Sequence, residues 1–413
     1  MTISSSVKKP PLAATAQPVA AAAATSAIVK NSASANIIAL SSTALALPGI
    51  ALADAPPTQS TVSYKLSNYQ EDDLSRSEVP SGELNRYDID VHQFQLVAPM
   101  GRNMSVHVDA NYESLSGASP WFTTLGLDGK PVVNLSGASG ISDNRSELSV
   151  GTRYYLDNGS FAGNIGYSEE NDYRAVYFGL NGERHYNNDL TTLAGGFSYS
   201  SDDIFPTDAA LFNRVRDEDK QSSSVFVSLT QIINQVSSFQ SALSFTEQSG
   251  FLSDPYKLRD VRPEDKTQIA WSNSYRRFFV AANAALHVNY RFYHDDFGIS
   301  SHTSDVSWHQ NLGRQFQIVP QLRYYSQSAA DFFTNVDDFL NPLSEYQSSD
   351  YRLSAFGAVS GGFSLIADMG SWKATLTAER YLANDKYSAY AVSQPSTALV
   401  KYNRLSLGVD FSF

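Results

Sequence analysis

Cysteine is absent from this sequence of 413 residues. Without cysteine the chain cannot form a disulfide framework, a thiolate metal site, a thiol nucleophile or a covalent link to a c-type haem. The body of the sequence also lacks a long apolar run, so no membrane-spanning helix is available, because such a helix needs roughly 20 mostly apolar residues. Spanning by β-strands stays open, since a barrel strand shows lipid only every second side chain and averages out as polar.

Basic residues are outnumbered by acidic ones. The chain has 30 Lys and Arg residues against 42 Asp and Glu residues, which gives a net charge of -12. Nucleic acid is therefore not an expected partner, because neutralising phosphates needs a basic surface. We expect no cofactor and no dedicated metal site. Aromatic residues, in contrast, are plentiful, with 23 Tyr and 23 Phe.

The first 53 residues predict an export signal. Lys8, Lys9 and Lys30 precede an apolar stretch at residues 37–47, and Ala51-Leu52-Ala53 then offers a small-x-small cleavage pattern. The segment before Lys30 is long and rich in Ala and Ser, so a misassigned start codon and a functional extension both remain open. We predict a signal at 1–53, a short periplasmic segment at 54–60 and one further domain at 61–413. Loss of the signal would leave 27 basic and 42 acidic residues, a net charge of -15.

Alternation with a period of two dominates the sequence after about residue 60 and indicates β-strands. In the cleanest case, Met104, Val106, Val108, Ala110 and Tyr112 share one face, while Ser105, His107, Asp109, Asn111 and Glu113 share the other. A strand that separates lipid from a wet lumen has this pattern.

Fifteen further segments alternate in the same way. Their apolar faces are Val62/Tyr64/Leu66, Tyr87/Ile89/Val91, Leu148/Val150/Tyr154, Phe161/Ile165/Tyr167, Val176/Phe178/Leu180, Leu193/Phe197/Tyr199, Val225/Val227/Leu229, Phe239/Leu243/Phe245, Ile269/Trp271, Leu286/Val288/Tyr290/Phe292, Val306/Trp308, Phe316/Ile318/Leu322/Tyr324, Leu353/Ala355/Val359, Trp372/Ala374/Leu376 and Leu405/Leu407/Val409/Phe411/Phe413. We predict an all-β fold, a transmembrane antiparallel up-and-down barrel of about 16 strands. A secreted β-sandwich or β-solenoid is the alternative, since its strands also have one apolar face.

The connections between these segments alternate in length, as they do in outer-membrane barrels with short periplasmic turns and long extracellular loops. Short links are expected at 99–102, 157–159, 187–189, 234–235, 276–277, 313–314 and 368–370. Longer loops are expected at 72–84, 114–142, 201–220, 248–266, 326–347 and 382–398, with brief ones near Asn171 and Asp296. An even number of strands would place both ends of the barrel in the periplasm.

The last segment predicts an assembly signal. Gly408, Phe411 and Phe413 match the polar-x-Gly-x-x-apolar-x-aromatic pattern that the barrel-assembly machinery reads, with Ser406 as the polar residue. The physical basis is strand addition, in which an exposed β-edge pairs with the assembly factor. Together with the export signal, this pattern predicts localisation in a bacterial outer membrane, with membrane lipid and the assembly machinery as partners.

Several short sequence segments resemble those of an uncharacterised outer-membrane family of Gram-negative bacteria, known as domain of unknown function 3570. They are Tyr64-Lys65 with Tyr69-Gln70-Glu71, Tyr351-Arg352-Leu353-Ser354 with Ser360-Gly361-Gly362, and Trp372-Lys373 with Glu379-Arg380-Tyr381. The resemblance implies a barrel over the whole exported chain. It transfers no catalytic residues, and it implies a small lipoprotein or a redox protein as a partner.

The predicted inner face is mixed in charge. The candidate lumen residues are Lys65, Asp88, Asp90, His107, Asp109, Glu113, Arg153, His287, Arg291, Arg323, Arg352, Lys373, Glu379, Arg404 and Asp410. Opposite charges in a wet lumen can set the selectivity of a pore. They can equally form cross-strand pairs that fill the lumen.

Three other features suggest chemistry, and each has an ordinary structural explanation. His294-Asp295-Asp296 could act as a general base, or it is a polar turn. Asp202-Asp203 with Asp217-Glu218-Asp219 could bind Ca²⁺, or it is a solvated loop. The apolar loop residues around Trp121 and Phe339 could form a plug or docking surface, or a small core of their own.

From these observations we expect a porin-like pore or an export channel for small solutes, with the 114–142 loop as its constriction. The first alternative is an envelope scaffold that docks a lipoprotein or redox partner. The second is a surface hydrolase that uses His294. We do not expect an enzyme.

Overall fold

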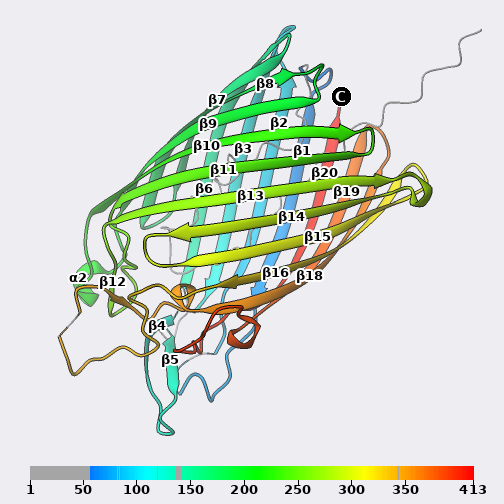
Figure 1. The fold of residues 1–413 in the computed structure, drawn as a ribbon. Coiled ribbons are helices and arrows are strands. Elements are labelled where there is room, and N and C mark those ends of the chain that lie inside the picture. The colour runs from blue at the N-terminus through cyan, green and yellow to red at the C-terminus, as the bar shows by residue number, and fades with distance from the viewer. Residues whose placement is uncertain (1–55, 81, 83, 119, 136–140, 343) are drawn as a thin grey trace, which may run out of the picture.

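The computed structural model describes residues 56–413 except 81, 83, 119, 136–140 and 343. The predicted export signal lies outside the described residues. Sixteen strands of the described chain form one closed antiparallel barrel, in which neighbours in sequence are neighbours in space (Figure 1). This confirms the predicted all-β barrel and its strand number. Such a barrel is typical of bacterial outer-membrane proteins.

In chain order the barrel strands are β1 (Thr61–Glu71), β2 (Asp88–Pro99), β3 (Met104–Gly117), β6 (Ile141–Leu156), β7 (Gly159–Glu169), β8 (Tyr173–Tyr186), β9 (Thr191–Ile204), β10 (Glu218–Asn234), β11 (Ser237–Gly250), β13 (Asp265–Phe279), β14 (Ala284–Asp295), β15 (Ser300–Leu312), β16 (Phe316–Gln327), β18 (Phe356–Asp368), β19 (Trp372–Asn384) and β20 (Lys401–Ser412). The barrel closes where β1 pairs with β20, from Thr61 opposite Ser412 to Glu71 opposite Tyr402.

Smaller elements lie in the connections. Two small two-stranded sheets form apart from the barrel sheet: β4 (Pro120–Leu125) pairs with β5 (Pro131–Leu135) in a hairpin, and β12 (Asp260–Val261) pairs with the distant β17 (Gln347–Ser348). The helices are α2 (Ala209–Phe212) and the 3-10 turns η1 (Val280–Ala282), η2 (Tyr351–Leu353) and η3 (Asp385–Tyr387). No helix in the described part of the chain is long and apolar enough to cross a membrane.

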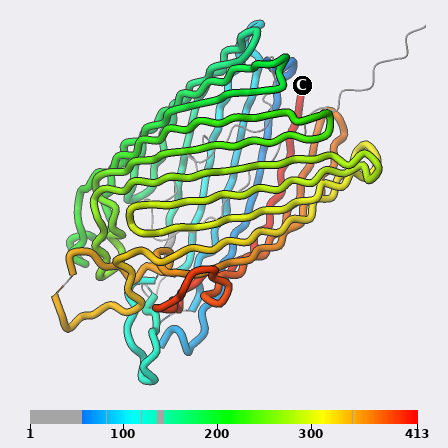
Figure 2. The backbone as a smooth tube through the Cα atoms, viewed as in Figure 1, coloured from blue at the N-terminus to red at the C-terminus, as the bar shows by residue number. Residues whose placement is uncertain are grey.

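The two ends of the barrel differ. One end, here called the turn end, carries the links 100–103, 157–158, 187–190, 235–236, 280–283, 313–315 and 369–371. The other, the loop end, carries the connections 72–87, 118–140, 170–172, 205–217, 251–264, 296–299, 328–355 and 385–400. The chain's C-terminus lies at the turn end, while α2, β4, β5 and β12 gather at the loop end (Figures 1 and 2).

The alternation of each strand sorts its side chains between the inner and outer faces. On β8, the outward Val176, Phe178 and Leu180 are 39% to 57% exposed, whereas the inward Tyr173 and Ala175 are 1% exposed. Directly opposite residues of paired strands share a face, so the registers extend this assignment around the barrel. The predicted apolar faces lie outward on fourteen strands, and β2 and the start of β18 are the exceptions.

Those two exceptions have one cause. Tyr87, Ile89 and Val91 are buried inside the barrel and not on its outer face, and Leu353 and Ala355 are buried in a loop before β18 begins. At the loop end the interior is filled by apolar loop residues. Apolar side chains therefore point inward there, which reverses the rule that holds next to lipid.

One predicted turn was misplaced. Arg276 and Arg277 lie within β13, and the connection to β14 is η1 followed by Asn283. Asn283 has the left-handed backbone conformation, with φ 48°, that Asn adopts more readily than most residues. Two consecutive arginines indicated a polar turn, but their side chains point to opposite faces of the strand.

The inner and outer faces predict different responses to the same substitution on β19. Leu376 points outward, and its neighbour Thr375 points inward opposite Gly408 of β20, which has no side chain. We expect Leu376→Arg to lower the free energy of unfolding by about 2–4 kcal/mol in lipid vesicles, because the charge enters the apolar band. Thr375→Arg is the matched control and should cost much less. Equal losses in urea unfolding would contradict the assigned faces.

Candidate functional site

The inner wall of the barrel is polar and charged. Twelve of the residues expected in the lumen lie on the inner face of a strand: Lys65, His107, Asp109, Glu113, Arg153, His287, Arg291, Arg323, Lys373, Glu379, Arg404 and Asp410. Arg352 lies in η2 and not on a barrel strand. The structure therefore brings residues from distant parts of the sequence onto one continuous wall.

Asp88 and Asp90 do not line the lumen, which corrects their assignment. They pair with Gln70 and Asn68 of β1, on the outer face, and the amide of Asn68 donates to both carboxylates at 2.9 and 3.0 Å. The outer face is polar here because β2 begins at the loop end. The inward positions of the same stretch are taken by Ile89 and Val91.

Most lumen charges are joined in ion pairs, either between neighbouring strands or, for Arg153 of β6 and Glu183 of β8, across the intervening β7. Lys373 lies 3.0 Å from Asp410, Arg404 lies 2.5 Å from Glu379, and Arg323 bonds to Asp305. On the other side, Arg153 contacts Glu183 at 3.3 Å and Lys220 contacts Asp202 at 3.0 Å. Sequence reasoning missed Glu183 and Asp305 as lumen residues, and it assigned Asp202 and Lys220 to the 201–220 loop. Period-two counting puts them on inner faces, but only the strand register shows which charges are opposite.

The loop end is occupied by a folded assembly of loops, here called the loop lid, comprising the described residues of 72–87, 118–140, 251–264, 328–355 and 385–400. Its largest apolar cluster joins barrel residues such as Tyr69, Ile89 and Tyr402 with Val79, Val133 and Tyr351 of three loops. A second cluster packs Phe297, Phe333 and Leu353 together. Apolar burial of this kind stabilises the closed arrangement.

Buried ion pairs also hold the loop lid. Arg86 bonds to Glu71 at 2.7 Å, with both side chains 1% exposed, and its guanidinium lies over the Tyr351 ring at 5.3 Å. The Asp350 carboxylate, fully buried, accepts hydrogen bonds from Arg262 at 2.8 Å and from Arg352. Arg262 bonds in turn to Asp260, and Arg352 reaches Asp254 at 3.4 Å. Two loop segments, 251–264 and 328–355, are thus joined around one carboxylate.

Charge fixes the protonation of that carboxylate. Burial alone would raise the pKa of Asp350, but the positive charges of Arg352, Lys257 and Arg262 outweigh burial and hold its pKa well below the usual range. Asp254 differs, because burial raises the pKa of its carboxyl despite the nearby Arg352. Asp350 is therefore the ionised centre of the network.

Exposure along the inner wall shows how far solvent-sized space reaches. On most strands, the inward-facing side chain close to the loop end is buried. These residues are Glu71, Ile89, Leu115, Arg145, Ser168, Tyr173, Asp202, Lys220, Asp295, Ser301, Gln327, Phe356, Ala383 and Tyr402. Toward the turn end, the side chains of Lys373 and Asp410 are 26% and 34% exposed. Arg291, farther along the wall, is also exposed. The loop end is therefore covered, and exposed charge persists along the wall on β14, β19 and β20. On the opposite wall, Ser105 and Ser160 close to the turn end are buried, and the side chains of Arg153 and Glu183 are only 11% and 7% exposed.

The hypothesis of a surface hydrolase relied on His294 and its acidic neighbours, and the structure places the side chains of His294 and Asp295 apart. His294 points outward, where its Nδ1 lies 3.0 Å from the Ser300 hydroxyl, whereas Asp295 points inward. The Asp295 carboxylate accepts from Lys266 at 2.9 Å and from the Tyr293 hydroxyl at 2.7 Å. Since the two side chains lie on opposite faces of β14, Asp295 cannot orient His294 as a base.

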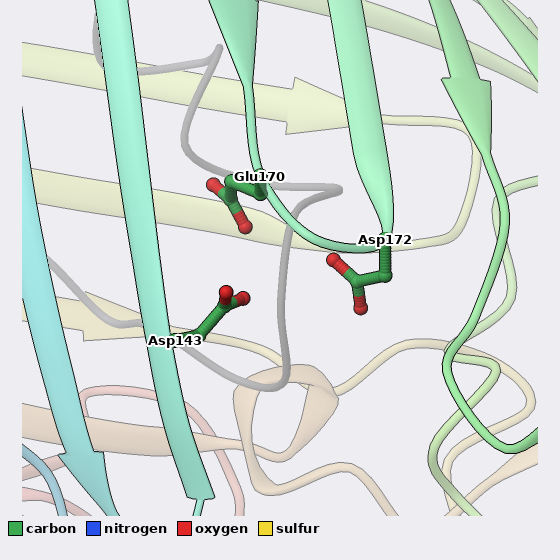
Figure 3. A group of neighbouring side chains, drawn as sticks. All are labelled: Asp143, Glu170 and Asp172. Carbon is green, nitrogen blue, oxygen red and sulfur yellow. The ribbon is translucent and has the colours of Figure 1, made fainter.

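The acidic residues considered for Ca²⁺ divide between the two faces, since Asp202 points inward to Lys220, whereas Asp203 lies on the outer face opposite Asp219. The structure instead brings Asp143, Glu170 and Asp172 together, with one oxygen of each within 4.8 Å of the others (Figure 3). Asn171 donates to Asp143 at 2.7 Å, Tyr256 donates to Asp172, and Arg145 lies 3.8 Å from Glu170. These contacts give the cluster a structural role within the loop end.

The residues of the expected assembly signal end the closing strand. Gly408 lies opposite Lys65, and the rings of Phe411 and Phe413 stack on the outer face with their centroids 5.8 Å apart. Backbone bonds between Phe413 and Ser60 extend the β1 and β20 pairing by one step. Recognition by an assembly factor stays a prediction.

Comparison with known proteins gives a family and a set of similar folds. A family model described as "Protein of unknown function (DUF3570)" matches residues 37–395. No curated protein sequence matches the chain. Similar solved structures include the siderophore receptor PirA from Pseudomonas aeruginosa, with 12% identity, 86% of this chain and 62% of that chain covered, and a TM-score of 0.45. This chain thus spans less than two thirds of that receptor.

Two other similar structures have different lengths. A bacterial polysaccharide outer membrane secretin has 9% identity over 86% of this chain and 98% of its own, with a TM-score of 0.49. CdiB from Acinetobacter baumannii has 7% identity over 86% of this chain and 60% of its own, with a TM-score of 0.48.

The Asp350 network yields a prediction for the loop lid. We expect Asp350→Asn to lower the stability of the lid by about 3–5 kcal/mol, because it leaves Arg262 and Arg352 buried with an uncompensated charge. Hydrogen exchange should speed up across 328–355, while the amides of mid-barrel strands stay protected. Glu345→Gln, an exposed acid in the same loop, is the control. The role of Asp350 is refuted if both variants exchange alike.

The pH dependence of the lid follows from the same group. A carboxyl whose pKa is lower in the folded than in the unfolded state, where it is near 3.9, stabilises the folded state. This stabilisation is complete above the unfolded-state pKa and is lost as the pH falls through the folded-state pKa. The raised pKa of Asp254 acts in the opposite sense and favours the folded lid as the pH falls. We therefore expect the lid's exchange protection, corrected for intrinsic rates, to be no weaker at pH 5 than at pH 7. Progressive loss of protection over that interval would contradict this.

Proposed function

The chain belongs to the DUF3570 family of proteins of unknown function, and we propose that it is an outer-membrane channel for small polar solutes, closed at rest by its own loops. The outward apolar band contacts lipid, and Gly408, Phe411 and Phe413 present the last strand to the barrel-assembly machinery. Neither a cofactor nor a catalytic residue enters this proposal.

The observation that supports a channel most directly is the exposure of charged groups inside the barrel. Asp410 near the turn end and Arg291 near the loops both point inward, and both retain solvent-accessible surface. A lumen filled by side chains would bury them, as it does in narrow barrels. Charged groups on a wet wall can discriminate between solutes by their charge.

The loop lid supports a channel that opens rather than one that stays open. It is held by two apolar clusters and by buried ion pairs, and residues of 118–140 take part, since the Val133 amide donates to the Glu78 carbonyl at 2.8 Å. Loops anchored to one another move together. A transition that separates them would expose the upper lumen, with the barrel wall unchanged.

Planar-bilayer recording of the purified barrel tests the channel. We expect brief, infrequent openings in the wild type, because the closed lid dominates. Asp350→Asn should raise the open probability several-fold by loosening the lid, whereas Glu345→Gln should leave it unchanged. Heat-modifiable migration in gels would verify that each variant is folded.

Deletion of 120–135, replaced by a short Gly-Ser linker, gives an independent measurement. This variant removes the β4 and β5 hairpin and should increase unitary conductance if that hairpin narrows the path. The channel would be refuted if the wild type, Asp350→Asn and the deletion variant were all folded and none of them conducted above background.

A second candidate function rests on the outer surface of the loop end. Trp121 and Phe122 pack edge-to-face with each other, and Phe122 packs in the same way against Phe339, while Leu340 beside it is 96% exposed. An exposed apolar patch marks interaction sites. A scaffold that docks a lipoprotein or redox partner would use this patch. The scaffold would be favoured over the channel if a lipoprotein or redox protein co-purified in stoichiometric amount with the wild type and not with Leu340→Ser.

A further inference from the structure

Two arginines on the inner wall depart from the pairing of the lumen charges. Within the described residues, neither Arg276 on β13 nor Arg291 on β14 lies within ion-pair distance of a carboxylate. The nearest acids along the wall are already engaged, because Asp305 bonds to Arg323 and Asp295 bonds to Lys266. Unpaired guanidinium groups on a wall of paired charges leave a local excess of positive charge.

Arg276 lies near the turn end and points into the barrel. Ser238 of β11 and His287 of β14 are directly opposite it in the two neighbouring strands. Its Nε is buried and has no hydrogen-bond partner in the part of the chain that the structure describes. A guanidinium carries five N–H donors in a fixed fork, the geometry that fits two oxygens of one oxyanion.

His287 offers a second donor at the same place. Its ring packs against that of His309, with centroids 3.9 Å apart and the ring planes 34° from parallel. The nitrogens of His309 are engaged, with Nε2 3.0 Å from the Ser307 hydroxyl and Nδ1 3.4 Å from Gln317. Across the described residues, no hydrogen bond reaches either ring nitrogen of His287. His309 thus fixes the ring plane of His287 and leaves its N–H available to a ligand.

Arg291 continues the positive wall toward the loop lid. It follows His287 on the same face of β14, four residues and therefore about 14 Å farther along the strand. Asn289, opposite Ser274, lies between them. Arg291 is exposed, with its guanidinium 5.3 Å from the centre of the Tyr293 ring. An anion entering from the turn end would meet Arg276 and His287 first and Arg291 next.

We propose that Arg276 and His287 bind a small oxyanion, such as phosphate or a carboxylate, and that Arg291 extends this site into an anion path along β13 and β14. This inference rests on the proposed channel, for which it names the class of solute. The overall negative charge of the chain does not oppose it, because outer-face and loop acids lie outside this wall and the other lumen acids are paired or lie across the barrel.

Adjacent arginines on β13 supply a matched pair of variants. Arg276→Gln removes a positive charge from the inner wall. Arg277→Gln removes the same charge one residue away on the outer face, where Arg277 lies over the Phe279 ring. Both variants change net charge equally, so a difference between them reports position.

The first measurement is selectivity in bilayers. In a potassium chloride gradient the wild type should favour chloride over potassium, and inorganic phosphate on the turn side should reduce the chloride current. For Arg276→Gln, the phosphate concentration for half block should rise about tenfold or more, since a charge-assisted hydrogen-bonded contact is lost. Arg277→Gln should retain block and selectivity. Potassium-selective currents that phosphate does not affect would overturn the anion site and leave the channel intact.

The second measurement does not depend on conductance. Calorimetric titration of inorganic phosphate into the folded, detergent-solubilised barrel should show binding to wild type and Arg277→Gln, and weaker binding to Arg276→Gln and His287→Gln. Absence of current with this pattern of binding would reject the channel and retain the anion site. Absence of phosphate binding, or equal binding by all four proteins, would overturn the site.

Discussion

Every main-chain N–H and C=O group in the hydrocarbon core of a membrane must bond to another group of the protein, because no water is present there. In this chain that requirement is met by pairing each strand with both neighbours and by closing the sheet between β1 and β20. Closure removes the free edges of the sheet. It also creates an inside and an outside, and the alternation of the sequence, the charged wall and the enclosed loops all depend on that division.

The sequence predicted most of the barrel because lipid and water impose opposite demands on alternate residues. Wherever a strand separates the two, as β8 does at Val176 and Tyr177, the period-two pattern fixes both the strand and its phase. The prediction failed at Asp88 and Asp90, where β2 begins at the loop end and its inward side chains pack into an apolar cluster with loop residues. At the loop end, an apolar side chain is buried whether it faces lipid or the packed loops inside the barrel, so its hydrophobicity alone does not identify the inner face.

The lumen was predicted less completely, because a charged side chain's effect depends on what lies across from it. Alternation placed Lys373, Glu379, Arg404 and Asp410 inside, but their pairing follows from the registers of β19 with β20. Arg276 was hidden in an assumed turn. Its lack of a partner became visible only when the neighbouring strands were in place, since an unpaired charge is a property of several strands together.

The seam between β1 and β20 also determines the order in which this molecule can fold. The hydroxyls of Thr61 and Ser412 meet at 3.0 Å although 351 positions separate them in the chain. All other barrel pairings join strands that are consecutive around the wall and close in sequence, so they can zip progressively. The seam must wait for both of its strands. Until then the growing sheet has two unsatisfied edges, and contacts of such long range form slowly. A folding catalyst that shields those edges would therefore accelerate the pairing of β1 with β20 more than any earlier step.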